Sequence, residues 1–262
     1  MSTASILILT ITVLAAALMA VLCALATSTV VQSRRHRRQP LVDAARSSVV
    51  ASLSTDSPEL EDVMSVLSEL LDREVATIIT ELVTSFNGSS LATLNAIAEK
   101  SGLLPKARAG IHSRRWSRRL YSARLLTAFA AEPDHLPALL IDRAPEVRAQ
   151  AAAWAAIKPD QEAIDLLVVM LDDPDGICRF AAQNALITIG PEIAPALTGL
   201  METDRGRTTH LALQVAAVIG DERFIAPAVD LTKNGSPTTR ARAASVLAGS
   251  GDPSTAPALI DL

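Results

Sequence analysis

Apolar segments of helical length recur at a fixed period through the second half of the chain. Every second segment opens with a polar residue, which is usually arginine, and continues with alanines and leucines at three- and four-residue intervals. The opening residues lie 29, 31, 30 and 31 residues apart, at Arg119, Arg148, Arg179, Thr209 and Arg240. The last three are each followed eleven residues later by a glycine: Gly190, Gly220 and Gly251. A period of about thirty residues predicts a helical solenoid.

A second apolar segment precedes each of these helices, so that one repeat is predicted to be a helical hairpin. These first helices are expected at 136–141, 163–171, 193–201 and 224–231, with a last one from residue 256. The turns inside the hairpins contain Pro145, Asp173-Pro174 and Pro237. Proline at the first helical position loses no needed hydrogen bond, and glycine favours a helix end. Alanine on one helix face allows the neighbouring hairpin to approach closely.

These turns, the helix-start arginines, the alanine pairs and the glycine stops resemble the HEAT-repeat family, in its short bacterial PBS-lyase-like form, over residues 113–262. The resemblance implies an all-α, right-handed, armadillo-like α-solenoid of about five hairpins. It also implies that the arginines bond turn carboxylates of neighbouring repeats. The structural anchors would then be Arg148, Arg179, Arg240, Asp173, Gly190, Gly220 and Gly251. Thr209 breaks the pattern after a turn without proline, and irregular stacking is expected there.

The other strong pattern is an apolar run without charge from Ile6 to Val31. As a helix it would extend roughly 39 Å, against a hydrocarbon core of about 30 Å. Four arginines follow at once: Arg34, Arg35, Arg37 and Arg38. Because the first five residues carry no charged side chain, the positive-inside rule predicts a single-pass inner-membrane protein. Its N-terminus would lie outside and its C-terminal domain in the cytoplasm.

A cleaved signal peptide is the competing interpretation of this run, since Ala24-Leu25-Ala26 offers a cleavage site. The run is long for a signal peptide, no Lys or Arg precedes it, and the arginines after it would oppose export. We therefore predict an anchor at 1–33 and a basic juxtamembrane linker at 34–57. A divergent helical cap at 58–112 follows, because apolar residues from Leu60 onward recur at helical intervals. The solenoid would occupy 113–262.

Opposite charges are segregated within a net charge of −4. Residues 56–81 are acidic and residues 100–124 are basic, and the two stretches either neutralise one another or face solvent. Alternatively, Arg114, Arg115, Arg118 and Arg119 form a patch that senses an anionic membrane surface. The arginines at 34–38 would attract anionic headgroups with about 1 kcal/mol per charge. No nucleic acid partner is expected, because residues 132–175 are predominantly acidic.

The sequence offers little catalytic chemistry. Its four histidines are scattered and its two cysteines are far apart, so no metal site, cofactor or disulfide is predicted. No phosphate-binding loop or nucleophile motif occurs. An enzyme is therefore not expected. Short HEAT-like repeats also occur in bilin lyases, and the alternative of a bilin-lyase-like enzyme stays open on that resemblance alone.

The pattern as a whole favours a membrane-anchored scaffold that presents its repeats to a protein partner. Proteins of this layout resemble those found near membrane enzymes such as polysaccharide-synthesising glycosyltransferases, so a membrane enzyme is the expected client. Exposed positions of the second helices are the candidate contact points. They are Arg115, Trp116, Arg118, Arg207 and Arg242.

Overall fold

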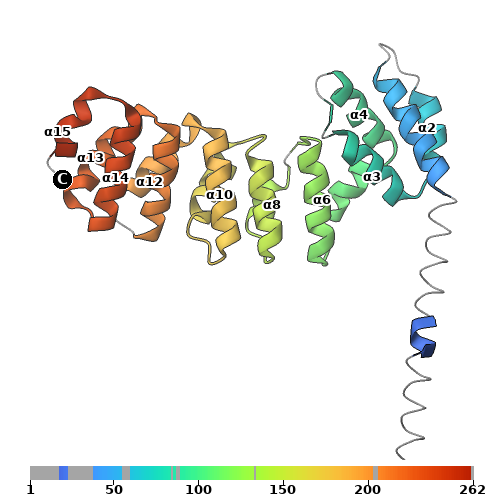
Figure 1. Cartoon of the computed structure of the whole chain (residues 1–262), viewed down its shortest axis with the longest axis horizontal. Coiled ribbons are helices and arrows are strands. Elements are labelled where there is room, and N and C mark those ends of the chain that lie inside the picture. Colours follow the sequence, from blue (N-terminus) through green and yellow to red (C-terminus); the bar gives the residue numbers. More distant parts are fainter. Residues whose placement is uncertain are drawn as a thin grey trace, which may run out of the picture. The chain divides into compact units, whose positions relative to one another are not determined.

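The computed structural model describes residues 18–22, 38–54, 60–83, 85–86, 89–132, 134–202 and 206–260. Regular secondary structure in these ranges is entirely helical, which confirms the predicted all-α class (Figure 1). The chain divides into two compact units, residues 1–101 and 102–262. The predicted domain limits at 57/58 and 112/113 stay a prediction.

The first unit contains helical residues 38–53 and the helices α2 (Leu60–Ser68), α3 (Asp72–Val83) and α4 (Ser89–Lys100). Apolar residues at helical intervals face its core: α2 buries Val63 and Leu67, and α3 buries Ile78 and Ile79 among others. Arg46 pairs with Glu81 across two of its helices. Part of the acidic charge of this unit is therefore balanced within the unit itself.

The second unit is a series of five helical hairpins within residues 102–250, followed by one more helix. The hairpins are α5 (Leu103–Gly110) with α6 (Trp116–Ala128), α7 (Leu136–Leu140) with α8 (Pro145–Ala155), α9 (Gln161–Met170) with α10 (Gly176–Ile189), α11 (Ala194–Met201) with α12 (Arg207–Ile219), and α13 (Ile225–Asn234) with α14 (Pro237–Ser250). Short 3-10 turns precede α11, α13 and the last helix α15 (Ala256–Ile260). This arrangement is the predicted helical solenoid.

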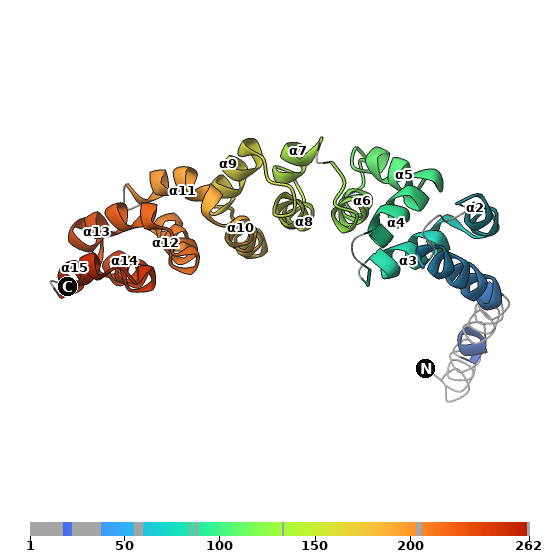
Figure 2. The same ribbon diagram turned by 90° about the horizontal axis from the view of Figure 1, so that it is seen from above.

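Figure 2 shows the helices of this unit in two rows. The first helices, α5, α7, α9, α11 and α13, form one row, which we call the outer row. The second helices, α6, α8, α10, α12 and α14, form the other, which we call the inner row because the unit bends toward that side. Successive second helices pack directly on one another. Residues of the first helices and residues of the second helices thus lie on two different faces of the unit.

Small residues make the close stacking of the second helices possible. Ala151, Ala182 and Ala243 are fully buried where three of these helices meet their neighbours. Trp154 has the largest fully buried side chain of the described core, with 1% of its surface exposed. It donates its indole N–H to the Ala131 carbonyl at 3.1 Å. Because that polar atom is satisfied, Trp154 serves the core rather than a ligand.

The helix ends follow the local signals of the sequence. Asp175 caps α10 by accepting from the Ile177 N–H, and Ser236 caps α14 by accepting from the Thr239 N–H. Gly220 and Gly251 end α12 and α14 with φ values of 67° and 64°, a left-handed conformation that side chains with a Cβ rarely adopt. These Asp, Ser and Gly residues therefore fix where α10 and α14 begin and where α12 and α14 end.

Stacking is uneven around α12, in the repeat where irregular stacking was expected. α12 packs far more extensively on α14 than on α10. The turn before α12 includes residues 203–205, which lie outside the described residues. The junction between α10 and α12 is accordingly the less tightly packed of the two.

The structure describes little of the predicted membrane anchor. Of the run from Ile6 to Val31, only residues 18–22 are described, and these are helical. No described helix is both long enough and apolar enough to cross a bilayer.

Candidate binding surface

Arginines at the starts of the second helices join successive repeats. Arg119 forms a bidentate ion pair with Asp142, with both N–O distances 2.6 Å, and Arg148 forms the same pair with Asp173 at 2.7 Å. Arginines at this position also donate to the turn that precedes their own helix. Arg148 Nη1 lies 2.8 Å from the Asp142 carbonyl oxygen, and Arg179 Nη1 lies 2.6 Å from the Asp173 carbonyl oxygen. One guanidinium thus ties its own turn to the turn of the following repeat.

Electrostatics show that both carboxylates are charged partners. Burial raises the pKa of Asp142. The hydrogen bonds from Arg119 and the Ala144 N–H, together with the nearby positive charges, lower this pKa by more than burial raises it. The same balance holds for Asp173, whose hydrogen bonds come from Arg148 and the Asp175 N–H. The pKa of each carboxyl therefore lies below its ordinary value. Arg119 and Arg148 are occupied by these pairs and are not available to a partner.

The fourth repeat replaces the arginine with a histidine. Counted from the N-cap of α12, His210 occupies the place of Arg148 and Arg179, and its Nε2 lies 3.0 Å from Thr239 Oγ1 of the next second helix. Thr209, predicted to hold this place, is instead buried one residue earlier. In α10 and α14, which have 14 residues, the arginine lies eleven residues before the glycine that ends the helix. Because α12 has only 13 residues, the same distance from Gly220 falls on Thr209, one residue before His210.

The inner row is almost free of carboxylates. Glu146 is the single acidic residue in its five helices, all of which are described, whereas these helices carry eight arginines. The acidic residues of this unit lie in the turns and on the outer row, for example Glu162 and Asp230. The two rows therefore differ in charge.

The start of α6 brings three of the predicted contact residues together. Arg115 is its N-cap, Trp116 its first residue and Arg118 follows within the same turn. All three are exposed, and Trp116 is 48% accessible. In the described part of the chain, Arg115 and Arg118 form no ion pair, and Arg124 further along α6 forms none either.

The other two predicted residues lie on different helices, three and four repeats further on. Arg207 opens α12 and is exposed, with its Nη2 3.3 Å from Asp172. Arg242 in α14 is half-buried, and its Nε is buried without a hydrogen-bond partner in the described chain. Since α8 and α10 stand between α6 and α12, these two residues are separated from the three at the start of α6.

Exposed apolar side chains on α10 were not predicted as contact residues. Ile177 and Phe180, 65% and 62% exposed, are three residues apart on one face of this helix. Phe180 directly follows the helix-start Arg179, a position that holds Leu120 and Ala149 in the two preceding repeats. Aligning the repeats by helix position would have revealed the aromatic residue at this position of α10.

Of the predicted membrane-proximal arginines, Arg34, Arg35 and Arg37 lie outside the described residues. Arg38 begins the described helix at 38–53. Its Nη2 lies 3.0 Å from the Glu69 carbonyl oxygen and 3.4 Å from Glu74 Oε2. Arg38 is thus bonded within the first unit.

The described residues contain little reactive chemistry. No group of three or more His, Cys, Asp or Glu side chains among them is placed to hold a metal ion. Cys178 is buried, donates its S–H to the Pro145 carbonyl at 3.2 Å, and has a pKa raised by burial to about 11. A thiol with that pKa is a weak nucleophile at neutral pH.

A comparison with protein families agrees with this architecture. The family model described as HEAT repeats matches residues 132–217, which run from the start of the second hairpin of this unit through most of α12. No curated protein matches the chain. Among solved structures, an engineered protein from a structural genomics consortium is 18% identical, with a TM-score of 0.42, covering 74% of this chain and 96% of that one. A designed armadillo repeat protein, solved with the peptide (KR)4, is 15% identical with a TM-score of 0.42, covering 78% of this chain and 98% of that one.

The family match spans about a third of the chain and includes Arg148, Arg179 and the Asp173 turn. The hairpins on either side repeat the same two-helix arrangement. The comparisons show no catalytic family. Together, the matched segment and the stacked hairpins support a HEAT-repeat protein.

Proposed function

We propose that this protein is a scaffold whose inner row binds an acidic segment of a partner protein. The observation that carries the proposal is the charge of that row, where five arginines outside the ion pairs with Asp142, Asp173 and Asp172 accompany one carboxylate. A partner with acidic side chains would meet attraction along several repeats and little repulsion. Solenoids bind along such extended surfaces, since stacked hairpins present equivalent positions side by side.

Two places on the inner row fit the anchors of a protein interface. At the start of α6, Arg115 and Arg118 stand beside Trp116, and Trp and Arg are the side chains enriched among binding hot spots. In α14, the half-buried Arg242 provides the second cationic position. The exposed Ile177 and Phe180 lie between these places and offer apolar contact.

The proposal includes a membrane anchor. The uncharged run from Ile6 to Val31 with Arg34 to Arg38 behind it supports a single inner-membrane span, with the repeats on the cytoplasmic side. A partner held there would be membrane-associated, such as a glycosyltransferase. Fusing a reporter to the C-terminus and treating intact spheroplasts with protease tests the orientation. Protection of the reporter is the expected result, and its digestion would contradict the proposed orientation.

The scaffold proposal is tested by crosslinking in the native membranes. Full-length protein would be compared with Arg118→Glu and Arg242→Glu variants, and with Lys233→Glu on the outer row as the matched control. We expect one discrete partner crosslinked by the native protein and the control, and lost with both inner-row variants. A partner retained equally by all four proteins would place its binding site away from the inner row.

The free arginines at the start of α6 support a second candidate, the sensing of an anionic membrane surface. Arg114, Arg115 and Arg118 could face headgroups, whereas Arg119 is held by Asp142. Vesicles of phosphatidylglycerol test this function. Replacing the three free arginines by Gln should abolish salt-sensitive binding, and unchanged binding would exclude it. The bilin-lyase alternative has only the repeat resemblance in its favour.

A further inference from the structure

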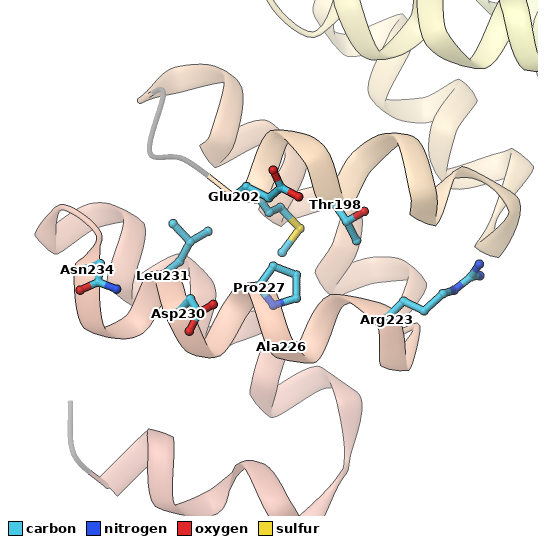
Figure 3. A pocket seen from close by; sticks show the side chains of 9 residues that line it. Thr198, Glu202, Arg223, Ala226, Pro227, Asp230, Leu231 and Asn234 are labelled. Atoms are coloured by element: carbon cyan, nitrogen blue, oxygen red, sulfur yellow. The ribbon is translucent and has the colours of Figure 1, made fainter.

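The outer row contains a groove between α11 and α13 with a volume of about 420 Å³ (Figure 3). One wall comes from α11 and its C-cap, and the other from one face of α13 and the turn before it. The lining residues that carry its chemistry are Met201, Glu202, Arg223, Pro227, Asp230 and Leu231. The α13 wall extends from residue 223 to residue 234, roughly 16 Å along the chain. The groove is therefore long enough for a segment of polypeptide.

The groove has a net negative charge. Glu202 and Asp230 are exposed on its two walls, and neither forms an ion pair among the described residues. The cation in the lining, Arg223, is already neutralised: its Nε and Nη2 each lie 2.8 Å from an oxygen of Asp221. Arg223 also donates to the Pro191 carbonyl at 2.6 Å, and it lowers the pKa of Asp221 to about 2. Among the residues that the structure describes, the two carboxylates of the groove thus have no counterion.

The surface between these carboxylates is apolar. Met201 and Leu231 are buried at its base, and Pro227 lies on the α13 wall beside Asp230 and below Glu202 in Figure 3. Lysine and arginine combine a charged end with an aliphatic stem that packs on apolar surface. Their side chains match both features of the groove, whereas an anion or a purely apolar side chain matches at most one.

We propose that this groove binds a basic amphipathic segment of a partner protein, with cationic side chains at Glu202 and Asp230 and an apolar side chain over Pro227. Charge complementarity identifies the occupant, because the carboxylates of Glu202 and Asp230 attract basic side chains. The proposal does not depend on the function proposed for the inner row. It gives the solenoid two faces that select partner segments of opposite charge.

The test uses the full-length protein in detergent and a fluorescein-labelled helical peptide in which one leucine lies three residues from a lysine on each side. Fluorescence anisotropy would measure binding to the native protein and to a Glu202→Gln/Asp230→Asn variant. A Glu162→Gln/Glu192→Gln variant is the matched control, because it removes two exposed carboxylates outside the groove, one on α9 and one in the turn before α11. A third variant, Ala226→Arg, places a tethered cation at the exposed groove wall.

We expect the groove variant to weaken peptide binding about five- to tenfold, as two partly screened ion pairs are lost, and the control to bind like the native protein. Ala226→Arg should weaken binding as well. Replacing the peptide's leucine by serine should weaken binding to the native protein. Equal binding by the groove variant and the control, or equal binding of the leucine and serine peptides, would overturn the proposal.

Discussion

The joints between repeats differ between the front and the back of the solenoid. From α6 to α10, successive repeats are tied by bidentate ion pairs, Arg119 with Asp142 and Arg148 with Asp173. Between α12 and α14, the joint is a hydrogen bond between His210 and Thr239 and involves no carboxylate. The hairpins are of the same kind in both regions, so one stacking geometry is compatible with two chemistries.

The two partners of the ion pair are replaced together. Asp142 and Asp173 each lie two residues before the N-cap of a second helix, and Asn234 holds that place before α14. A histidine in place of arginine thus faces a joint without the carboxylate. The free energy of burying a charge explains why the arginine and the carboxylate are replaced together. A largely buried charge that has lost its partner strongly destabilises the fold, whereas replacing both partners can be nearly neutral. The pair, rather than either residue, is the unit of variation.

The largest expected effect is the loss of one partner at the front joint. Arg148→Ala leaves the Asp173 carboxylate, whose side chain is 9% exposed, without its counterion, and it also frees the Asp142 carbonyl. We expect the free energy of unfolding to fall by about 2–3 kcal/mol. Urea unfolding followed by circular dichroism measures this change.

A double variant provides the control for this prediction. Arg148→Met/Asp173→Asn removes both charges and should be less destabilised than Arg148→Ala, because no charge is left unpaired. A double variant as unstable as the sum of its two single variants would show that the pair is not coupled.

The same joint should depend on pH. The pKa of Asp173 is below its ordinary value in the folded protein, so its contribution is present above the ordinary aspartate value of about 3.9 and is lost as the pH falls through the folded value. The stability difference between native protein and Arg148→Ala should therefore be full at pH 7 and shrink toward pH 3. Urea midpoints at pH 7, 5 and 3 measure it, and a constant difference would contradict the assigned pair.

The architecture could be predicted from the sequence because local signals determine it. Proline at helix starts, glycine at helix ends and a thirty-residue period specify hairpins whatever their neighbours are. The same signals misplaced one repeat position, which Thr209 was predicted to hold and His210 holds, because α12 is one residue shorter than α10 and α14. When one helix is a residue shorter than its neighbours, the thirty-residue period stays visible. Positions inferred from the distance to the end of that helix are then displaced by one residue.

The candidate surfaces were harder to predict, because they depend on which side of a helix is covered. Arg119 and Arg118 are adjacent in sequence, yet one is bonded to Asp142 and the other is exposed. The groove between α11 and α13 was missed entirely, since Glu202 and Asp230 are 28 residues apart and meet only through stacking of the outer row. Sequence spacing shows faces within one helix but not the space between two.

Rebuilding the ion pair at the back joint should have a moderate effect. In His210→Arg/Asn234→Asp, the two residues would occupy the places of Arg148 and Asp173. We expect the double variant to be more stable than the sum of its single variants by about 1 kcal/mol, because each single change introduces a charge without a partner. A double-mutant cycle by urea unfolding measures this coupling, and a coupling of zero would show that the back joint cannot accept the front chemistry.

The smallest effect is expected at the exposed pair of Arg207 and Asp172. Their N–O distance is 3.3 Å and their side chains are 60% and 65% exposed, so solvent screens the attraction and the two long side chains lose entropy when they pair. Arg207→Ala should change the free energy of unfolding by less than about 0.5 kcal/mol. Urea unfolding beside Arg148→Ala makes the comparison. A loss at Arg207 as large as that at Arg148 would mean that burial is not what distinguishes the joints. A small one leaves Arg207 available for a partner at little cost to the fold.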